Sequence, residues 1–419
     1  MVAAALTTLV AIGATWFIVE HSAGGNETRT TSSEVGSVLT VPRPEQTTGE
    51  SSASSAPPAG SSSATSTNVS APSKDPRLTG HGPIASIVQS FVGHTSPVTS
   101  AVFSPDGSKL ATGATDHTAK IWDVATGSML HNLADHTGDV NWVAFDPTGT
   151  RLVTASSDGT ARVWNVDTGE PLAVLQHDLS STYFVVNTAE FSHDGSMIVT
   201  AGNDATARIW DASTGAPLHV LTHGSFVFTA WFSPDDTTVL TASLDDTAGV
   251  WAVASGERIE TLDGHTDKVD GAVFSPDGTM IVTASADGTA KVWDAATGTP
   301  IATLMGHVGP VRSAMFSPDG SRVVTSSDDR SADVWDSRTG TRLFALSDTA
   351  EVRAATFTPD GSEIVTLSAD YVGRIWDATT GSPIAELQDV VNDMSFSPDG
   401  RTIVTPSIGS ASAVIWSMG

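Results

Sequence analysis

Tryptophan recurs at a nearly constant spacing along most of this chain. Neighbouring members of the series are 40 to 46 residues apart, and each follows a phenylalanine that opens a turn such as FSPDG. The series consists of Trp122, Trp164, Trp210, Trp251, Trp293, Trp335, Trp376 and Trp416. A period of this length indicates a repeat protein in which each unit buries its apolar face against its neighbours.

Each repeat divides into short apolar runs separated by turn residues. In the fifth repeat, MIVTAS (280–285) is followed by ADGT (286–289), AKVWD (290–294) and an apolar run that closes the unit (296–304). Runs of four to six residues with Asp-Gly turns between them predict strands joined by hairpins. No stretch of ten residues after residue 80 has the helical period. Four short antiparallel strands are therefore expected in each repeat.

The repeats share a second pattern, in which Gly-His, then Asp, then Trp-Asp recur at near-constant offsets across residues 84–419. This pattern resembles the WD-repeat β-propeller family, in a bacterial, membrane-anchored form. The resemblance implies an all-β fold, an eight-bladed propeller of four-stranded antiparallel blades. Seven blades is the alternative, if the degenerate last repeat forms no blade. Residues 83–94 resemble the closing run 300–307, so we expect the N-terminal strand to complete the last blade.

The resemblance also implies a hydrogen-bonded tetrad of loop His, strand Thr, turn Asp and strand Trp in each blade. An imidazole can donate to a carboxylate on one side and accept on the other, which satisfies polar groups that are costly to bury. The seventh repeat lacks the His, and the eighth retains only Trp416, with Pro406 and Ser410 at the other offsets, so we expect these two blades to be less rigid. The expected tetrad residues are His94, Thr112, Asp116, Trp122, His136, Thr154, Asp158, Trp164, His177, Thr200, Asp204, Trp210, His223, Thr241, Asp245, Trp251, His265, Thr283, Asp287, Trp293, His307, Thr325, Asp329, Trp335, Thr366, Asp370 and Trp376.

Composition narrows the possible chemistry. The net charge of −27 argues against nucleic-acid binding, which needs clustered Lys and Arg. The absence of cysteine excludes thiolate nucleophiles and cysteine-ligated metals. Six of the twelve histidines and many of the aspartates occupy repeated positions, and no nucleophile or phosphate-loop motif is present. We therefore expect no catalytic, cofactor or metal site, and no enzymatic activity.

One group of apolar residues is unusual for the loops in which it lies. In the family, partner contacts fall three and five residues after the His and one residue before the Asp. In blade four these positions hold Phe226, Phe228 and Leu244, and an insertion in blade three adds Tyr183 and Phe184. Apolar groups gathered on one face are typical of an interface hot spot. Mutual packing that stabilises the long loop is the alternative.

The N-terminal region differs from the repeats. Residues 2–19 carry no charged side chain and would span about 27 Å as a helix, near the lower limit for crossing a bilayer. An uncleaved anchor, a cleaved signal peptide and a buried helix are the three interpretations. We favour the anchor, because a basic start is missing and His21 occupies a position where a cleavage site needs a small residue. The expected domains are residues 1–21 as anchor or signal segment, 22–80 as a disordered Ser/Thr/Pro-rich linker, and 81–419 as the propeller.

These observations predict a single-pass, membrane-tethered, monomeric propeller, on the extracytoplasmic side, that acts as a rigid scaffold for other proteins. An extracytoplasmic ligand-sensing domain of a signalling protein is the alternative. A propeller hydrolase or lyase is a lesser one, which would need polar residues to converge at the central channel.

Overall fold

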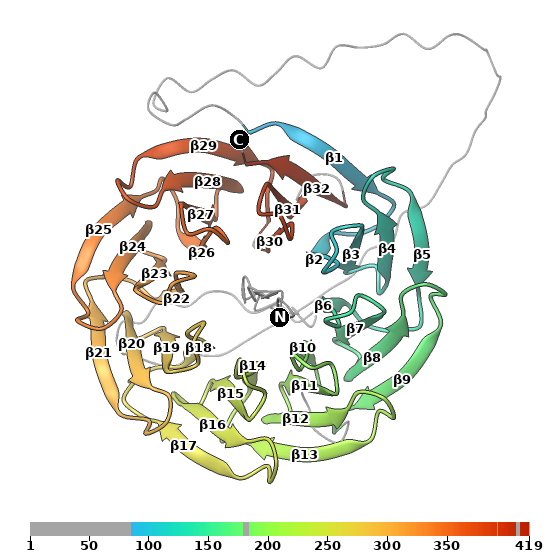
Figure 1. Ribbon diagram of the computed structural model, residues 1–419, viewed down its shortest axis with the longest axis horizontal. Coiled ribbons are helices and arrows are strands. Elements are labelled where there is room, and N and C mark those ends of the chain that lie inside the picture. Colours follow the sequence, from blue (N-terminus) through green and yellow to red (C-terminus); the bar gives the residue numbers. More distant parts are fainter. Residues whose placement is uncertain (1–84, 179–183, 392, 408–410, 419) are drawn as a thin grey trace, which may run out of the picture. The chain divides into compact units, whose positions relative to one another are not determined.

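The computed structural model describes residues 85–178, 184–391, 393–407 and 411–418. Within these ranges the secondary structure consists of strands in eight four-stranded antiparallel sheets. The sheets are arranged as blades around a central axis, with the first strand of each repeat innermost and the last outermost (Figure 1). The eight-bladed prediction is confirmed, and the seven-bladed alternative is wrong.

The blades are numbered in chain order. The strands are, in blade one, β2 (Val98–Phe103), β3 (Lys109–Ala114), β4 (Ala119–Asp123) and β5 (Met129–Leu133); in blade two, β6 (Val140–Phe145), β7 (Arg151–Ser156), β8 (Thr160–Asn165) and β9 (Pro171–Gln176); in blade three, β10 (Val186–Phe191), β11 (Met197–Gly202), β12 (Thr206–Asp211) and β13 (Pro217–Thr222); in blade four, β14 (Val227–Phe232), β15 (Thr238–Ser243), β16 (Ala248–Ala252) and β17 (Arg258–Leu262); in blade five, β18 (Val269–Phe274), β19 (Met280–Ser285), β20 (Thr289–Asp294) and β21 (Pro300–Met305); in blade six, β22 (Val311–Phe316), β23 (Arg322–Ser327), β24 (Ser331–Asp336) and β25 (Arg342–Ser347); in blade seven, β26 (Val352–Phe357), β27 (Glu363–Ser368), β28 (Val372–Asp377) and β29 (Pro383–Gln388); and in blade eight, β30 (Ser395–Phe396), β31 (Thr402–Ser407), β32 (Ser412–Ser417) and β1 (Ile87–Val92).

The turn between the first two strands of a blade is built by its own side chains. In blade one, Ser104 Oγ donates to Asp106 Oδ1 over 2.6 Å, and the same carboxylate oxygen accepts from the backbone N–H of Ser108 over 3.0 Å. Gly107 follows Asp106 with φ of 71°, in the left-handed region that a residue without Cβ adopts at little cost. The Ser–Pro–Asp–Gly signature therefore ends one strand and starts the next.

The N-terminal strand closes the ring. β1 pairs antiparallel with β32, with Phe91 opposite Ala413, so blade eight contains strands from both ends of the described chain. Phe91 is 1% exposed, and its ring lies edge-on to Trp122 of blade one at a centroid distance of 5.8 Å. This confirms the expected closure and leaves blade eight with no unpaired edge where the fourth strand belongs.

The hydrophobic core lies between blades. One cluster joins Val163 and Leu175 of blade two to Ile198 and Trp210 of blade three, and equivalent clusters fill the other interfaces between neighbours. The repeated Trp is therefore the side chain that each blade buries against the blade before it. A blade without its neighbours would expose this surface, which is why the repeats fold as one ring.

The predicted anchor and linker, at residues 1–21 and 22–80, lie outside the described residues. Within the described ranges, no helix is both long and apolar enough to cross a bilayer.

Candidate functional site

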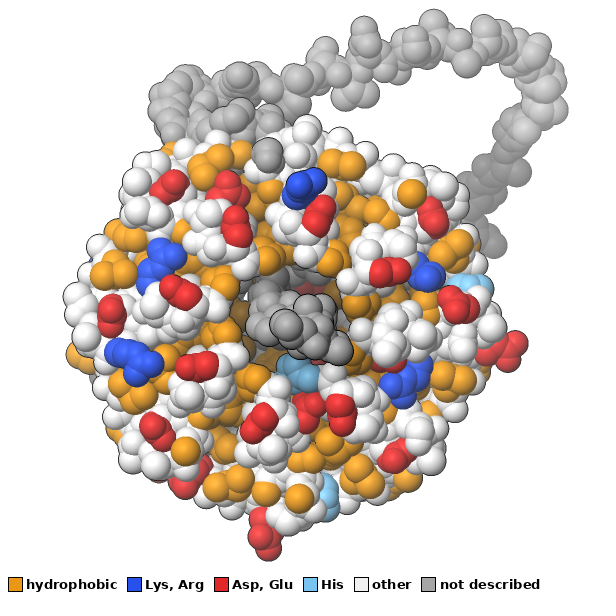
Figure 2. All heavy atoms as spheres, viewed as in Figure 1, with side chains coloured by type: hydrophobic (Ala, Val, Ile, Leu, Met, Phe, Trp, Pro, Cys, Tyr) orange, Lys and Arg blue, Asp and Glu red, His pale blue; other side chains and the backbone are white. Residues whose placement is uncertain are grey.

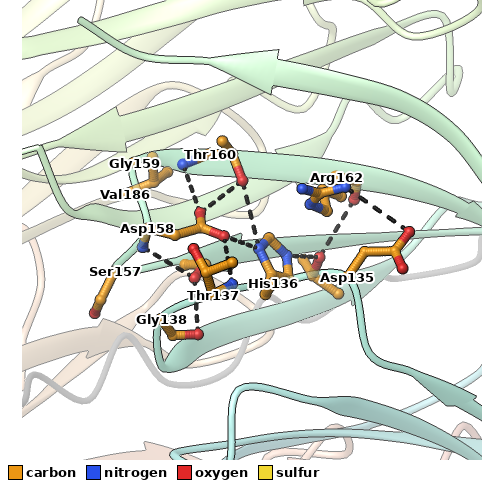
Figure 3. Close-up of polar contacts among 12 residues, drawn as sticks. Asp135, His136, Thr137, Gly138, Ser157, Asp158, Gly159, Thr160, Arg162 and Val186 are labelled. Carbon is orange, nitrogen blue, oxygen red and sulfur yellow. Dashed lines mark hydrogen bonds and ion pairs between the residues drawn. The ribbon is translucent and has the colours of Figure 1, made fainter. Parts of the chain in front are cut away.

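The loops that carry the Gly-His pairs are held by buried hydrogen-bond networks. In blade two, His136 Nδ1 lies 2.8 Å from Asp158 Oδ2, and His136 Nε2 lies 2.7 Å from Thr154 Oγ1, which also accepts from Trp164 Nε1 over 3.0 Å. Figure 3 shows the His136 ring between Asp158 and Thr160 on one side and Asp135 and Arg162 on the other. The backbone N–H of Thr137 donates to the same Asp158 oxygen over 3.1 Å, which ties the loop to the turn.

Ionisation of the turn aspartate is favoured by this network. Burial raises the pKa of Asp158, but the hydrogen bonds from His136 and Thr160 outweigh it and hold the pKa below its usual value. In blade one, burial lowers the pKa of His94 despite the opposing effect of Asp116. The imidazole is therefore expected to be neutral while the carboxylate is charged, which suits a structural network better than proton transfer.

The same geometry recurs in blades one to six. The distance from His Nδ1 to the Asp carboxylate is 2.8 to 3.1 Å, and the Trp Nε1 to Thr Oγ1 distance is 2.8 to 3.0 Å. Blade three keeps this geometry across its longer interval, with His177 Nδ1 3.1 Å from Asp204 Oδ2. Each of these six imidazoles therefore connects its loop to the Asp of the turn.

Blade seven replaces the histidine with an arginine network that the sequence analysis missed. Asp348 stands at the His offset, and Arg374 donates to Asp348 Oδ1 over 2.6 Å and to Asp370 Oδ2 over 3.0 Å. The Arg374 side chain is 3% exposed. Trp376 Nε1 still donates to Thr366 Oγ1 over 2.9 Å. An acidic residue 22 positions before the turn Asp, with an Arg four positions after it, was the signal in the sequence.

Blade eight retains part of a tetrad, shifted by one residue. Trp416 Nε1 donates to Thr405 Oγ1 over 3.0 Å, whereas the constant offset pointed to Pro406. Ile403 pairs with Trp416, 13 positions on, whereas Ile198 and Trp210 of blade three are 12 positions apart. The expectation that Trp416 alone remained is therefore wrong, because this hairpin holds one extra residue. Ser410 lies outside the described residues.

Two of the three expected contact positions meet in the loops of these blades. The backbone N–H before the tetrad Asp donates to the carbonyl three residues after the His: Leu244 to Phe226 over 2.9 Å, and Ser157 to Asp139 over 2.8 Å. The same bond recurs in blades one, three, five, six and seven. In each of these blades the hydrogen bond joins the segment after the His position to the turn that carries the Asp.

The third position, five residues after the His in most blades, joins neighbouring blades. Asn141 Nδ2 donates to the Val186 carbonyl over 2.9 Å, and Asn187 Nδ2 donates to the Val227 carbonyl over 2.9 Å. Thr99 forms the corresponding hydrogen bond to the backbone of blade two. These polar side chains therefore hold the blades together as well as facing the loops.

Blades five and six use charged side chains at the same level. Asp270 is 3% exposed and lies 3.0 Å from Lys268 Nζ and 3.2 Å from Arg312 Nη1. Arg312 Nε also donates to Asp328 Oδ1 over 2.8 Å. Burial raises the pKa of Asp270, and both cations oppose this effect. The ion pairs are a bridge across two blades, since Arg312 contacts carboxylates from both.

The residues expected to form an apolar patch lie in blades three and four. Phe226, Phe228 and Leu244 are half-buried, and Phe184 is 38% exposed. Lys268 Nζ lies 5.8 Å from the Phe228 ring centroid. Tyr183 lies outside the described residues. The four described residues, Phe184, Phe226, Phe228 and Leu244, are called the apolar patch below.

Outside the tetrads, the described histidines are in separate places. His193 Nδ1 lies 2.8 Å from Asp236, His131 contacts the Asp167 carbonyl, and His117 lies 3.4 Å from Asp139. Across the described ranges, no three His, Asp or Glu side chains gather as metal ligands. Figure 2 shows acidic side chains dispersed around the face in view, with the fewer basic ones separated from each other.

Comparison with known proteins agrees with this architecture. The family model "WD domain, G-beta repeat" (WD40) matches residues 85–123, 127–165, 169–211, 215–252, 256–294 and 298–336. The computationally designed Ika8 protein is similar over 81% of this chain and all of its own, with 27% identity and a TM-score of 0.68. The C-terminal WD40 domain of Sif2 covers the same shares with 20% identity and a TM-score of 0.72, which shows likeness of fold.

Sequence similarity to a curated protein is local. Protein Mut11 of Chlamydomonas reinhardtii is 51% identical over 39 residues, which is 9% of this chain and 10% of that protein. One repeat is about this long, so the match concerns the repeat and not the whole of either protein. The six matched repeats, by contrast, cover more than half of the chain. This chain therefore belongs to the WD40-repeat family of β-propeller proteins.

Proposed function

We propose that this propeller is a non-enzymatic scaffold that binds another protein through its Gly-His loop face, at the apolar patch. Membership of the WD40 family supports this, because such propellers are typically interaction scaffolds. The partner would place an apolar side chain against Phe226 and Phe228, since partly exposed aromatic residues are common anchors at protein interfaces.

The contrast between blade four and its neighbours carries the proposal. Blades two and three place Asn141 and Asn187 where their side chains bond the next blade, but blade four places Phe228 at this position. A phenyl ring cannot make that hydrogen bond, so its presence needs another reason. Lys268 beside the ring adds a positive charge at the edge of the patch. An apolar side chain flanked by an acidic group would complement both features.

We also propose that residues 1–21 anchor the protein in a membrane and that residues 22–80 hold the propeller away from it on the extracytoplasmic side. The uncharged run at residues 2–19 and the Ser-, Thr- and Pro-rich composition that follows support this arrangement. Carbonate extraction of membranes tests the anchor, and protease access to intact cells tests the side.

Quantitative capture from the cognate cell extract tests the scaffold. A double change of Phe226→Ser and Phe228→Ser should remove a specific partner while the melting temperature stays within a few degrees of wild type. The matched control is Leu172→Ser with Leu218→Ser, since these leucines are 54% and 46% exposed on outer strands. Equal loss of the partner in both double variants would show that binding does not depend on the apolar patch. A large fall in melting temperature with Phe226→Ser and Phe228→Ser would show that the phenylalanines serve packing instead.

A further inference from the structure

A small cavity lies where the innermost strands of blades two, three and four end. It has a volume of about 60 Å³ and is lined by Phe145, Pro147, Glu190, Phe191, Ser192, His193, Trp231 and Phe232. These residues lie at the last positions of β6, β10 and β14 and in the turns that follow, among neighbouring inner strands in Figure 1. The Gly-His loops precede these strands, so the cavity is at the opposite end of the strands from the apolar patch.

The cavity holds a carboxyl group that lacks a compensating cation. Glu190 is half-buried, and its Oε2 accepts a long hydrogen bond of 3.4 Å from Trp142 Nε1. Burial raises the pKa of Glu190 to about 8, with the Trp142 hydrogen bond opposing this only in part. Within the described residues no Lys or Arg forms an ion pair with it. The corresponding positions of the two neighbouring blades hold Ala144 and Trp231.

Three buried polar groups on β10 and β14 have no hydrogen-bond partner among the described residues. Trp231 is 7% exposed, and its Nε1 has no hydrogen-bond partner among the described residues. Thr188 on β10 and Thr229 on β14 each bury a hydroxyl that is also unpaired in the described ranges. Buried donors and acceptors are normally satisfied by protein or by a bound molecule. Trp231 and Glu190 both line the cavity, so the indole N–H and the carboxyl are available to a molecule bound there.

The lining identifies the kind of ligand. Several aromatic rings surround the carboxyl, and the ring faces of Phe, Tyr and Trp attract cations. One face already does so, because the Arg151 guanidinium lies 5.0 Å from the Phe191 ring centroid. Arg151 is itself held by Asp146 and by the carbonyl oxygens of Ala212 and Gly195, so it is not the counterion of Glu190.

We propose that this cavity binds a small organic ammonium ion, with Glu190 as its counterion and the surrounding aromatic rings as its walls. The volume suits about four or five non-hydrogen atoms, by comparison with the space that single waters need. The Trp231 N–H would donate to an oxygen substituent of the ion, such as a hydroxyl. This inference is independent of the protein partner, which would bind at the other end of the strands.

Titration of the full chain with tetramethylammonium at pH 9, with binding measured by saturation-transfer NMR, tests the proposal. At this pH Glu190 is ionised, and the probe keeps its charge. A ligand of this size is expected to bind with a Kd of about 1 mM. The neutral isostere tert-butanol should bind about tenfold more weakly, because it lacks the charge that pairs with the carboxylate. Sodium chloride at equal ionic strength corrects for screening.

Glu190→Gln keeps the side-chain shape and should weaken tetramethylammonium binding about tenfold, whereas Glu260→Gln on an outer strand should not change it. Glu190→Gln removes an uncompensated charge, so we expect it to fold, and its melting temperature confirms this. Trp231→Phe should remove any preference for ethanolammonium over propylammonium, since both have four non-hydrogen atoms and only the first has a hydroxyl that the lost N–H could contact. Equal binding by Glu190→Gln and wild type, or no saturable binding of tetramethylammonium by wild type, would overturn the proposal.

Discussion

Asp393 joins the two blades at which the ring closes, and replacing it with an asparagine gives the most direct test of the structure. Its side chain is 8% exposed. Asp393 Oδ2 accepts from the backbone N–H of Ala101 in blade one over 3.0 Å, and Oδ1 accepts from the N–H of Met394 over 2.9 Å. Burial raises the pKa of this carboxyl to about 7, because these hydrogen bonds only partly offset desolvation.

The sign and size of the effect follow from this raised pKa. An Asp whose folded-state pKa is above its unfolded-state value contributes most to stability below the unfolded value of 3.8, and this contribution falls as the pH rises toward 7. A shift of about three pH units corresponds to about 4 kcal/mol in the free energy of unfolding. The side-chain amide of the variant does not titrate, and its Nδ2 cannot accept from a backbone N–H as a carboxyl oxygen does. Asp393→Asn should therefore be about 1–3 kcal/mol less stable than wild type near pH 4. Between pH 4 and pH 8 the difference should shift by about 4 kcal/mol in favour of the variant.

Urea unfolding of both proteins from pH 4 to pH 8 measures this difference, which should shift by about 1.4 kcal/mol per pH unit up to pH 7. Asp399→Asn is the matched control in the same blade. Hydrogen bonds from Ser397 and Arg401 lower the pKa of Asp399, so this variant should lose stability relative to wild type at neutral pH and not gain it. A pH-independent difference for Asp393→Asn would refute the reasoning.

Three further changes test the networks and the closure. Thr154→Val leaves the blade-two tetrad groups without their shared hydroxyl and should lower the free energy of unfolding by about 2–4 kcal/mol in urea; an unchanged midpoint would contradict a stabilising tetrad. Arg374→Met should lower the free energy of unfolding by about 3–5 kcal/mol, and adding Asp348→Asn should restore part of this loss. A double variant that is no more stable than the single one would argue against an ion-pair network. Phe91→Ala should lower the free energy of unfolding by about 3–5 kcal/mol and speed hydrogen exchange of the β32 amides. Exchange as slow as in wild type would show that β1 does not hold this strand.

The repeated parts of the fold could be predicted from the sequence because each depends on local chemistry. Pro-Asp-Gly turns and apolar runs define the strands, and the likeness of residues 83–94 to an outer strand predicted the closure of blade eight. The hydrogen-bond acceptor of Trp416 in blade eight could not be predicted, because it depends on the length of a turn. One extra residue between β31 and β32 shifts the acceptor to Thr405, and a fixed offset cannot detect such an insertion.

The candidate site was less predictable, because neighbouring blades decide what each side chain does. Asn141 and Arg312 lie at equivalent positions, yet one bonds a backbone carbonyl and the other pairs with carboxylates from two blades. Glu190 gave no signal at all in the sequence. Its importance comes from the aromatic rings that strands of adjacent blades place around it.

The pairing of β1 with β32 also has a consequence for synthesis. β1 emerges from the ribosome early, but its partner in blade eight is made last. Until then its apolar residues, such as Phe91 and Ile87, have no sheet to join, and the seven finished blades form an open arc with unpaired edges at both ends. The rate of ring closure, rather than the rate of blade formation, should therefore determine how long the newly synthesised chain can aggregate.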